Sequence, residues 1–419
     1  MFETPLKDIL VKNLEMVLTG DIKKPIREAD SMLIQDRKIV QIGHGLEPTE
    51  DCRIVDAQGM VAIPGLFETH AHNAISDYAP ITKTVDWMEN SGRCGVTTII
   101  TEGEHGPGYP RYFDDPVGVK AEAIFINKVF RNWRPGDCVR VYGGGIILVH
   151  GLTEPDFKEM AEAGVRIIAE IGGGGLYLAA ECKDMCNWAK ENGMFISIHC
   201  GPPSIPGSAE MTAENFIELG CDKASHLNGG STSLPWPQIK DIIDSTDCYL
   251  EIVFHSNLKI GLKIANYAAE RGELNRIVFG SDQAIGLGQT PGSIWGMMAQ
   301  IASLTDIPAE QVVCMATGNS ANCYRALGLN HGFLKEGYDA DIVITDTPPG
   351  PVEAVGKNFL DGLKIGLFCA PACTIFDGKI MGIIGRDYQP TKRHVKIDGV
   401  EYDVDDVVKY LFGIPHPGY

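Results

Sequence analysis

Six histidine and carboxylate residues stand at the ends of short strand-like segments of this chain, and their spacing limits how the chain can fold. The first two, His70 and His72, follow the hydrophobic run 61–67. Side chains two residues apart on a β-strand share a face, so these imidazoles can bind one divalent cation together. The other four also follow short strand-like runs: Glu170, His199, His226 and Asp282. We therefore predict a metal site.

The part of the chain from about residue 64 to residue 330 alternates strand, loop and helix. After the strand that delivers His70, the predicted strands are 97–101, 139–142, 165–169, 195–198, 223–225, 249–253 and 277–279. About 30 residues per βα unit is what a closed (β/α)8 barrel uses. Counted in such units, the six residues fall on strands 1, 4, 5, 6 and 8, and all would meet at the C-terminal mouth of the barrel. We predict an α/β fold, a TIM-like (β/α)8 barrel with its metal site at this mouth.

Both ends of the chain instead contain short β-strands joined by turns. The predicted strands and hairpin turns include 9–14, 31–35, 38–42 with a turn at 36–37, and 373–376 and 380–384 with an Asp-Gly turn at 377–378. We predict that residues 1–63 and 331–386 together form a β-sandwich domain beside a metal-binding barrel of residues 64–330. Residues 387–419 form a C-terminal extension to which the sequence assigns no role.

The composition narrows the class of protein. A net charge of −19 without a compensating basic block argues against a nucleic-acid partner. No run of about 18 apolar residues is present, so we expect no membrane span. Residues 1–8 lack the layout of a secretory signal, and the 12 cysteines show no spacing typical of a metal site or a disulfide framework. We expect reduced thiols and a cytoplasmic location.

These motifs resemble the amidohydrolase superfamily, in which Pro-Gly precedes an H-x-H on strand 1, histidines end strands 5 and 6, and an aspartate ends strand 8. The segment 337–343 (GYDADIV) is similar to that superfamily's return into its β-sandwich. Within the superfamily the likeness is strongest to the enamidases, which hydrolyse a cyclic enamide, the 6-oxo-tetrahydronicotinate ring. The stretches that carry this likeness are 77–80 (DYAP), 151–154 (GLTE), 204–208 (SIPGS), 225–226 with 228–230, and 314–320 (CMATGNS). The resemblance covers nearly the whole chain except roughly the last thirty residues.

The resemblance implies a role for each ligand-type residue. One divalent ion would be bound by His70, His72 and Asp282, and a second by His199 and His226. Glu170 would bridge the two ions, where many relatives use a carboxylated lysine on strand 4. The implied cofactors are two divalent metal ions, zinc or iron or both, and imidazole and carboxylate ligands also suit manganese or cobalt.

A site of this kind predicts hydrolysis of an amide. Two ions ~3.5–4 Å apart hold a bridging hydroxide, because they lower the pKa of water from 15.7 toward about 7. Asp282 is the predicted catalytic residue, which accepts the proton of this nucleophile and passes it to the departing nitrogen. Opening an enamide ring releases an enamine, which water converts to an aldehyde and ammonia. We therefore expect an enzyme that acts on a small cyclic amide of the 6-oxo-tetrahydronicotinate type, and we expect a homo-oligomer.

Other classes of protein are also consistent with the sequence. The chain could be a ring hydrolase of the hydantoinase or dihydropyrimidinase type, or an aminohydrolase that releases ammonia from an aromatic ring. Glu170 counts against the mononuclear aminohydrolases, which lack a strand 4 bridge. A non-catalytic assembly protein of the same fold is disfavoured, since such relatives lose metal ligands and all six are present here.

Four further residues are predicted to contact the substrate at the barrel mouth. His255 follows strand 7, and His105 lies in a glycine-rich loop after strand 2. Tyr78 belongs to the stretch 77–80, and Lys83 follows it closely enough to bind a substrate carboxylate. His255 departs from the enamidase pattern, so we expect it to influence the choice of substrate.

Overall fold

The structure is a computed structural model of the chain. It describes residues 6–72, 81–103, 114–132, 139–203, 208–229, 233–283, 290–383 and 391–401, with the backbone alone at 81–86 and 382–383. Among these residues, no helix is both long enough and apolar enough to cross a membrane.

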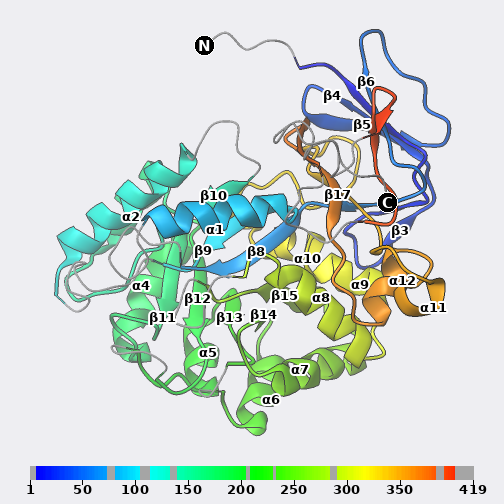
Figure 1. The fold of residues 1–419 in the computed structure, drawn as a ribbon. Helices are drawn as coiled ribbons and strands as arrows, with labels where there is room; N and C mark the ends of the chain where they lie inside the picture. The colour runs from blue at the N-terminus through cyan, green and yellow to red at the C-terminus, as the bar shows by residue number, and fades with distance from the viewer. Residues whose placement is uncertain are drawn as a thin grey trace.

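In the described part of the middle of the chain, eight strands alternate with eight helices. Figure 1 shows how these strands and helices are arranged as a barrel. The strands are β8 (Leu66–Ala71), β9 (Val96–Thr101), β10 (Arg140–Tyr142), β11 (Ile167–Ile171), β12 (Phe195–His199), β13 (Lys223–Ser225), β14 (Tyr249–Val253) and β15 (Ile277–Gly280). The helix that follows each strand is, in the same order, α1 (Ile81–Arg93), α2 (Pro116–Arg131), α3 (Glu154–Ala163), α4 (Ala179–Glu191), α5 (Ala213–Leu219), α6 (Trp236–Ser245), α7 (Leu258–Glu270) and α8 (Ser293–Leu304). The predicted fold class is confirmed.

Backbone contacts at two seams close the barrel. Within the described strands, β8 to β10 form one parallel sheet and β11 to β15 another. At the first seam, Ile146 forms a parallel bridge with Ile168. At the second, the N–H of Asp282 donates to the carbonyl of His70 at 3.0 Å. The second seam therefore brings the end of β15 against the H-x-H pair.

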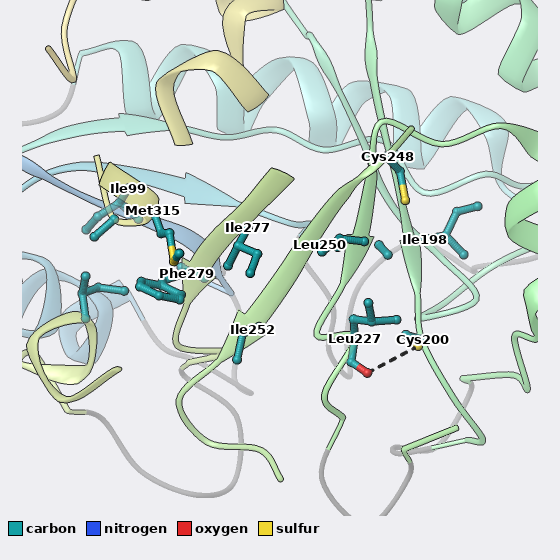
Figure 2. Close-up of a cluster of buried hydrophobic side chains, with 14 of the residues drawn as sticks. Ile99, Ile198, Cys200, Leu227, Cys248, Leu250, Ile252, Ile277, Phe279 and Met315 are labelled. Atoms are coloured by element: carbon teal, nitrogen blue, oxygen red, sulfur yellow. Dashed lines mark hydrogen bonds between the residues drawn. The ribbon is translucent and has the colours of Figure 1, made fainter. Parts of the chain in front are cut away.

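Alternation along the strands separates the two faces of the barrel wall. Figure 2 shows buried side chains of the core between the strands and the surrounding helices, among them Ile198, Leu250, Ile252, Ile277 and Phe279. Residues of the opposite parity face the barrel interior. Part of that interior is an apolar cluster of Ile100, Ile167, Phe195, Val278, Cys323 and Tyr324.

Short helices follow α8. They are α9 (Ala309–Met315) and α10 (Gly318–Cys323), which precede the return into the sandwich, and α11 (Val352–Val355) and α12 (Phe359–Lys364), which lie between two strands of the sandwich. The 3-10 turn η1 (Leu274–Arg276) precedes β15, and η2 (Arg325–Leu327) follows α10. Tyr324 follows α10 directly, and its ring packs on Phe195 with 4.5 Å between ring centroids. The segment after α10 therefore fills part of the barrel interior.

Two sheets built from both chain ends form the β-sandwich. Their strand orders are β20-β19-β6-β1-β4-β5 and β18-β17-β16-β7-β2-β3. The strands are β1 (Ile9–Lys12), β2 (Met16–Leu18), β3 (Ile26–Arg27), β4 (Ser31–Gln35), β5 (Lys38–Gly43), β6 (Arg53–Asp56), β7 (Val61–Pro64), β16 (Ile342–Thr345), β17 (Pro371–Phe376), β18 (Lys379–Ile383), β19 (Lys396–Ile397) and β20 (Val400–Glu401). Apolar side chains of both sheets, such as Ile34 and Ile344, share one core.

Part of the segment predicted to be a separate extension, residues 387–419, joins this sandwich. β19 pairs with β6 in antiparallel orientation, with Ile397 opposite Val55. Asp398 accepts a hydrogen bond from the backbone N–H of Ile54 at 2.9 Å. Residues 396–401 therefore belong to the sandwich, and two-residue strands are too short to show the alternation by which a sequence reveals them. The other domain limits stay a prediction.

Candidate metal centre

The six ligand-type side chains lie in two neighbouring groups at the C-terminal ends of the barrel strands. One group is His70, His72 and Asp282, and the other is Glu170, His199 and His226. In each group, one potential ligand atom per residue lies within 4.8 Å of the others. The fold thus brings together all six residues that the sequence singled out.

The first group joins the end of β8 to the residue just beyond β15. The Nε2 atoms of His70 and His72 are 3.1 Å apart. Asp282 Oδ1 is 3.6 Å from His70 Nε2 and 3.3 Å from His72 Nε2. Two imidazole nitrogens and a carboxylate oxygen therefore face one another around a single point.

Glu170 lies between the two groups. Its Oε2 is 3.5 Å from Nε2 of His70, and its Oε1 is 3.1 Å from Nε2 of His226. His199 completes the second group, with Nδ1 2.9 Å from His226 Nε2. Glu170 lies within β11 rather than after it, because the strand extends to Ile171. Each group thus receives one oxygen of the same carboxylate.

Local backbone features allow these side chains to approach one another. A Cβ atom on Gly280 would lie 2.5 Å from Cβ of His70, so only glycine permits β15 to come this close to β8. His226 and Asp282 have positive φ angles of 33° and 61°. Such angles are strained for these residues and persist only where the surroundings enforce them. Two ligand-type residues therefore depend on the packed barrel for their conformation.

The electrostatics favour carboxylates and a neutral imidazole among the ligand-type groups. Burial raises the pKa of Glu170, but the charges of His70 and His226 outweigh it and hold that pKa well below its usual value. For Asp282 burial also raises the pKa, and His70 makes the largest opposing contribution, so the net shift is again downward. Burial is the main cause that lowers the pKa of His199 to about 4. Metal binding needs anionic carboxylates and neutral imidazoles, so a bound cation would take the place of the protons that these carboxylates favour on His70 and His226.

The residues present fit a divalent metal centre. Glu170 Oε1 and Asp282 Oδ1 are buried and form no hydrogen bond of normal geometry within the described chain. Burying a polar atom without a hydrogen bond costs about 1–3 kcal/mol of folding free energy, so each of these oxygens needs another partner, such as a metal ion. Imidazole nitrogens and carboxylate oxygens are ligands of zinc and of other divalent transition metals. His70, His72 and Asp282 would hold one ion, and His199, His226 and Glu170 another.

Three charged residues beside these groups were not predicted from the sequence to belong to the site. Glu102, Lys223 and Glu251 have side chains with 0% exposed surface. The sequence does contain a pattern that identifies Glu251, because this residue lies between Leu250 and Ile252, which both pack in the core outside the strands. Because alternate residues of a strand face opposite sides, a charged residue at this position must face the barrel interior.

The structure describes the four predicted substrate contacts to different extents. His255 is partly buried, and its Nε2 lies 2.6 Å from Nε2 of Gln283, the neighbour of Asp282. Tyr78 and His105 lie outside the described residues. Lys83 lies in α1, where the structure describes the backbone only. Of the four, His255 is therefore the one whose side chain is described beside the six-residue site.

A (β/α)8 barrel with imidazole and carboxylate ligands at its mouth defines a class of hydrolytic enzymes that work with divalent metal ions. The family model described as "Amidohydrolase family" matches residues 149–381. The chain belongs to the amidohydrolase family and is a hydrolytic enzyme that acts on amide bonds.

Individual relatives agree with this assignment. The chain is 40% identical over 391 residues to an enamidase of Eubacterium barkeri, which covers 93% of this chain and 99% of the relative. A crystal structure of enamidase superposes with a TM-score of 0.87 at 39% identity, over 93% of this chain and 100% of that one. A 5'-deoxyadenosine deaminase of Methanosarcina mazei is 37% identical over 387 residues, 81% of this chain and 85% of the relative. The resemblance to the amidohydrolases and to enamidase is confirmed.

Proposed function

We propose that this protein opens a cyclic amide of the 6-oxo-tetrahydronicotinate type by metal-dependent hydrolysis, with release of ammonia. The observation that carries the proposal is the 40% identity to an enamidase over 93% of this chain. The two groups of ligand-type residues support it, because they supply the donor set that a metal-dependent amide hydrolase requires.

The proposed cofactors are two divalent ions, zinc or iron or both, with Glu170 as the ligand they share. Such ions, when bound, lower the pKa of water toward about 7 and polarise the amide carbonyl. The position of Glu170, with one oxygen toward His70 and the other toward His226, supports the shared ligand. Imidazole and carboxylate ligands do not by themselves select among zinc, iron, manganese and cobalt.

Asp282 is the proposed proton carrier. Its carboxylate accepts the proton of the attacking water, and it returns this proton to the ring nitrogen as the C–N bond breaks. The nitrogen needs this proton because an amide nitrogen leaves poorly as an anion. The products of ring opening are a carboxylate and an enamine, and a second water converts the enamine to an aldehyde and ammonia.

Ammonia release from 6-oxo-1,4,5,6-tetrahydronicotinate by the purified, metal-loaded protein tests the function. Hydantoin, dihydrouracil and 5'-deoxyadenosine are tested as alternative substrates; because ring opening of the first two releases no ammonia, their hydrolysis is followed by chromatography. We expect kcat/KM to be largest for the tetrahydronicotinate, to be lost after treatment with a chelator, and to return when metal is restored. A larger kcat/KM for deoxyadenosine would instead favour an aminohydrolase, the alternative that the deaminase relative supports.

Replacing Glu170 by alanine tests the two-ion proposal. The wild-type protein should contain close to two divalent ions per chain by elemental analysis, and Glu170→Ala should lose at least one of them, because both groups lose a ligand oxygen. The unfolding midpoint of the metal-free protein serves as the control for folding. One ion in active wild-type protein, with the same content in the variant, would contradict the bridging role.

His255 is a proposed substrate contact. Replacing it with alanine should chiefly raise KM, since a residue that binds the distant end of a substrate contributes affinity rather than chemistry. Loss of a hydrogen bond to a charged group costs roughly 1.5–3 kcal/mol, or about ten- to a hundredfold in kcat/KM. His44→Ala provides the control, because His44 lies in the sandwich beside Asp30. Unchanged kinetics in His255→Ala, measured at unchanged metal content, would remove His255 from the substrate site.

The cytoplasmic location is also a proposal. It is supported by the eleven cysteines that the structure describes, all of which are free thiols. The homo-oligomer stays a prediction from the sequence.

A further inference from the structure

A cluster of three charged side chains is enclosed within the barrel, beside the ligand-type residues but outside their set. Lys223 Nζ donates to Glu102 Oε1 at 2.8 Å and to Glu251 Oε1 at 2.6 Å. All three side chains have 0% exposed surface. Lys223 lies on β13, Glu251 on β14, and Glu102 directly follows β9. Burying three charges is costly unless every one is paired, so this cluster calls for a functional explanation.

Glu251 connects this cluster to both groups of the candidate metal centre. Its Oε2 is 2.6 Å from Nδ1 of His70 and accepts the backbone N–H of His226 at 3.0 Å. Its Oε1 accepts hydrogen bonds from Lys223 and, at 2.7 Å, from the hydroxyl of Thr69. Four donors therefore hold this carboxylate in one orientation.

The contact with His70 determines which ring nitrogen is available to a metal ion. A carboxylate accepts hydrogen bonds, so the proton of the neutral imidazole belongs on Nδ1. The lone pair of Nε2 then faces His72 Nε2 at 3.1 Å and Glu170 Oε2 at 3.5 Å. Carboxylates that bind the outer nitrogen of a metal-bound histidine fix the ring and raise its basicity.

Lys223 and Glu102 hold Glu251 in turn. Glu102 is itself fixed by the hydroxyls of Ser197 at 2.5 Å and Tyr324 at 2.9 Å. One ammonium between two carboxylates leaves a net negative charge next to the ligand groups. Such a charge stabilises cations bound nearby.

We propose that Glu251 is a positioning residue: it binds Nδ1 of His70 and so orients Nε2 of the same ring for metal binding. Lys223 and Glu102 hold Glu251 in place. The inference rests on the metal centre of the proposed function and adds three residues to it. None of the three is a metal ligand or is expected to touch the substrate.

Replacing Glu251 by glutamine provides the test, with Glu68→Gln as the matched control. Glu68 is also a buried glutamate beside His70, but its hydrogen bond to His70 is with the backbone N–H at 2.9 Å, and it also accepts the backbone N–H of Ser281 at 2.8 Å. The full chain is stripped of metal and titrated with zinc against a competing chelator. We expect Glu251→Gln to weaken zinc binding about 10- to 100-fold, and Glu68→Gln to retain the wild-type affinity.

Two outcomes would overturn the inference. Equal zinc affinity in wild type and Glu251→Gln would exclude a positioning role while leaving the metal centre intact. Wild-type protein that binds no zinc, cobalt, manganese or ferrous iron would refute the metal centre of the proposed function, and the inference with it.

A measurement on the wild type covers the case in which Glu251→Gln does not fold. A crystal structure of the zinc-loaded protein should show His70 bound to zinc through Nε2, with Nδ1 in hydrogen-bond contact with Glu251. Zinc bound through Nδ1, or a Glu251 side chain turned away from His70, would contradict the proposal.

Discussion

Replacing Asp282 by asparagine should lower kcat by about 10²- to 10⁴-fold, the range that general acid–base groups contribute. Asparagine keeps the size of the side chain and one oxygen ligand, but it cannot accept and return a proton. The charge of His70 outweighs the effect of burial and holds the pKa of Asp282 below its usual value, so this group is a carboxylate at neutral pH. The measurement is kcat on the best cyclic amide, together with metal content.

A second aspartate provides the control for this loss. Asp222 precedes β13 at the opposite end of the barrel, where it accepts the backbone N–H of Ile196 at 2.8 Å. Asp222→Asn should keep kcat near the wild-type value. If Asp282→Asn retained wild-type kcat at full metal content, Asp282 would not be the proton carrier.

Replacing Lys223 by methionine should destabilise the folded protein by about 3–5 kcal/mol, the usual effect of removing one partner from a buried ion pair. The variant leaves the carboxylates of Glu102 and Glu251, which Lys223 holds at 2.8 and 2.6 Å, without a counter-ion in an interior with no exposed surface. The measurement is the free energy of unfolding of the metal-free protein in urea, so that loss of metal does not contribute.

Lys120 offers a matched control on the surface. Its Nζ lies 2.7 Å from Asp156 and 2.7 Å from Glu159, so it too joins two carboxylates, but 20% of its side chain is exposed. Exposed ion pairs contribute roughly 0–1 kcal/mol, and Lys120→Met should lose no more than that. Equal losses of unfolding free energy in the two variants would mean that the enclosed cluster contributes no more to stability than a surface ion pair.

Much of the fold follows from short-range patterns in the sequence. Thr153 is the N-cap of α3, and its backbone N–H donates to Asp156 at 2.8 Å in a capping box. The turn at Asp36 and Arg37 has φ angles of 46° and 67°, which are those of a tight two-residue hairpin. Turns, caps and alternation depend on residues within a few positions of one another, and this is why a sequence reveals them.

Strand boundaries and strand pairings between distant parts of the chain were harder to predict from the sequence. β11 runs two residues beyond its predicted end and includes Glu170. β19 pairs with β6, about 340 positions earlier in the chain. No local pattern identifies a partner at that distance, because strand pairing depends on which edges the folded sheets present.

The sequence by itself determined the barrel, the sandwich from both chain ends and the six ligand-type residues, because each of these repeats a local pattern at regular spacing. Only the tertiary structure decided which residues surround the ligands. Glu251 reaches His70 across 181 positions of chain, and the positive φ angles of His226 and Asp282 exist because neighbouring strands enforce them. A contact of this kind depends on closure of the barrel, which places the ends of β8, β13, β14 and β15 beside one another.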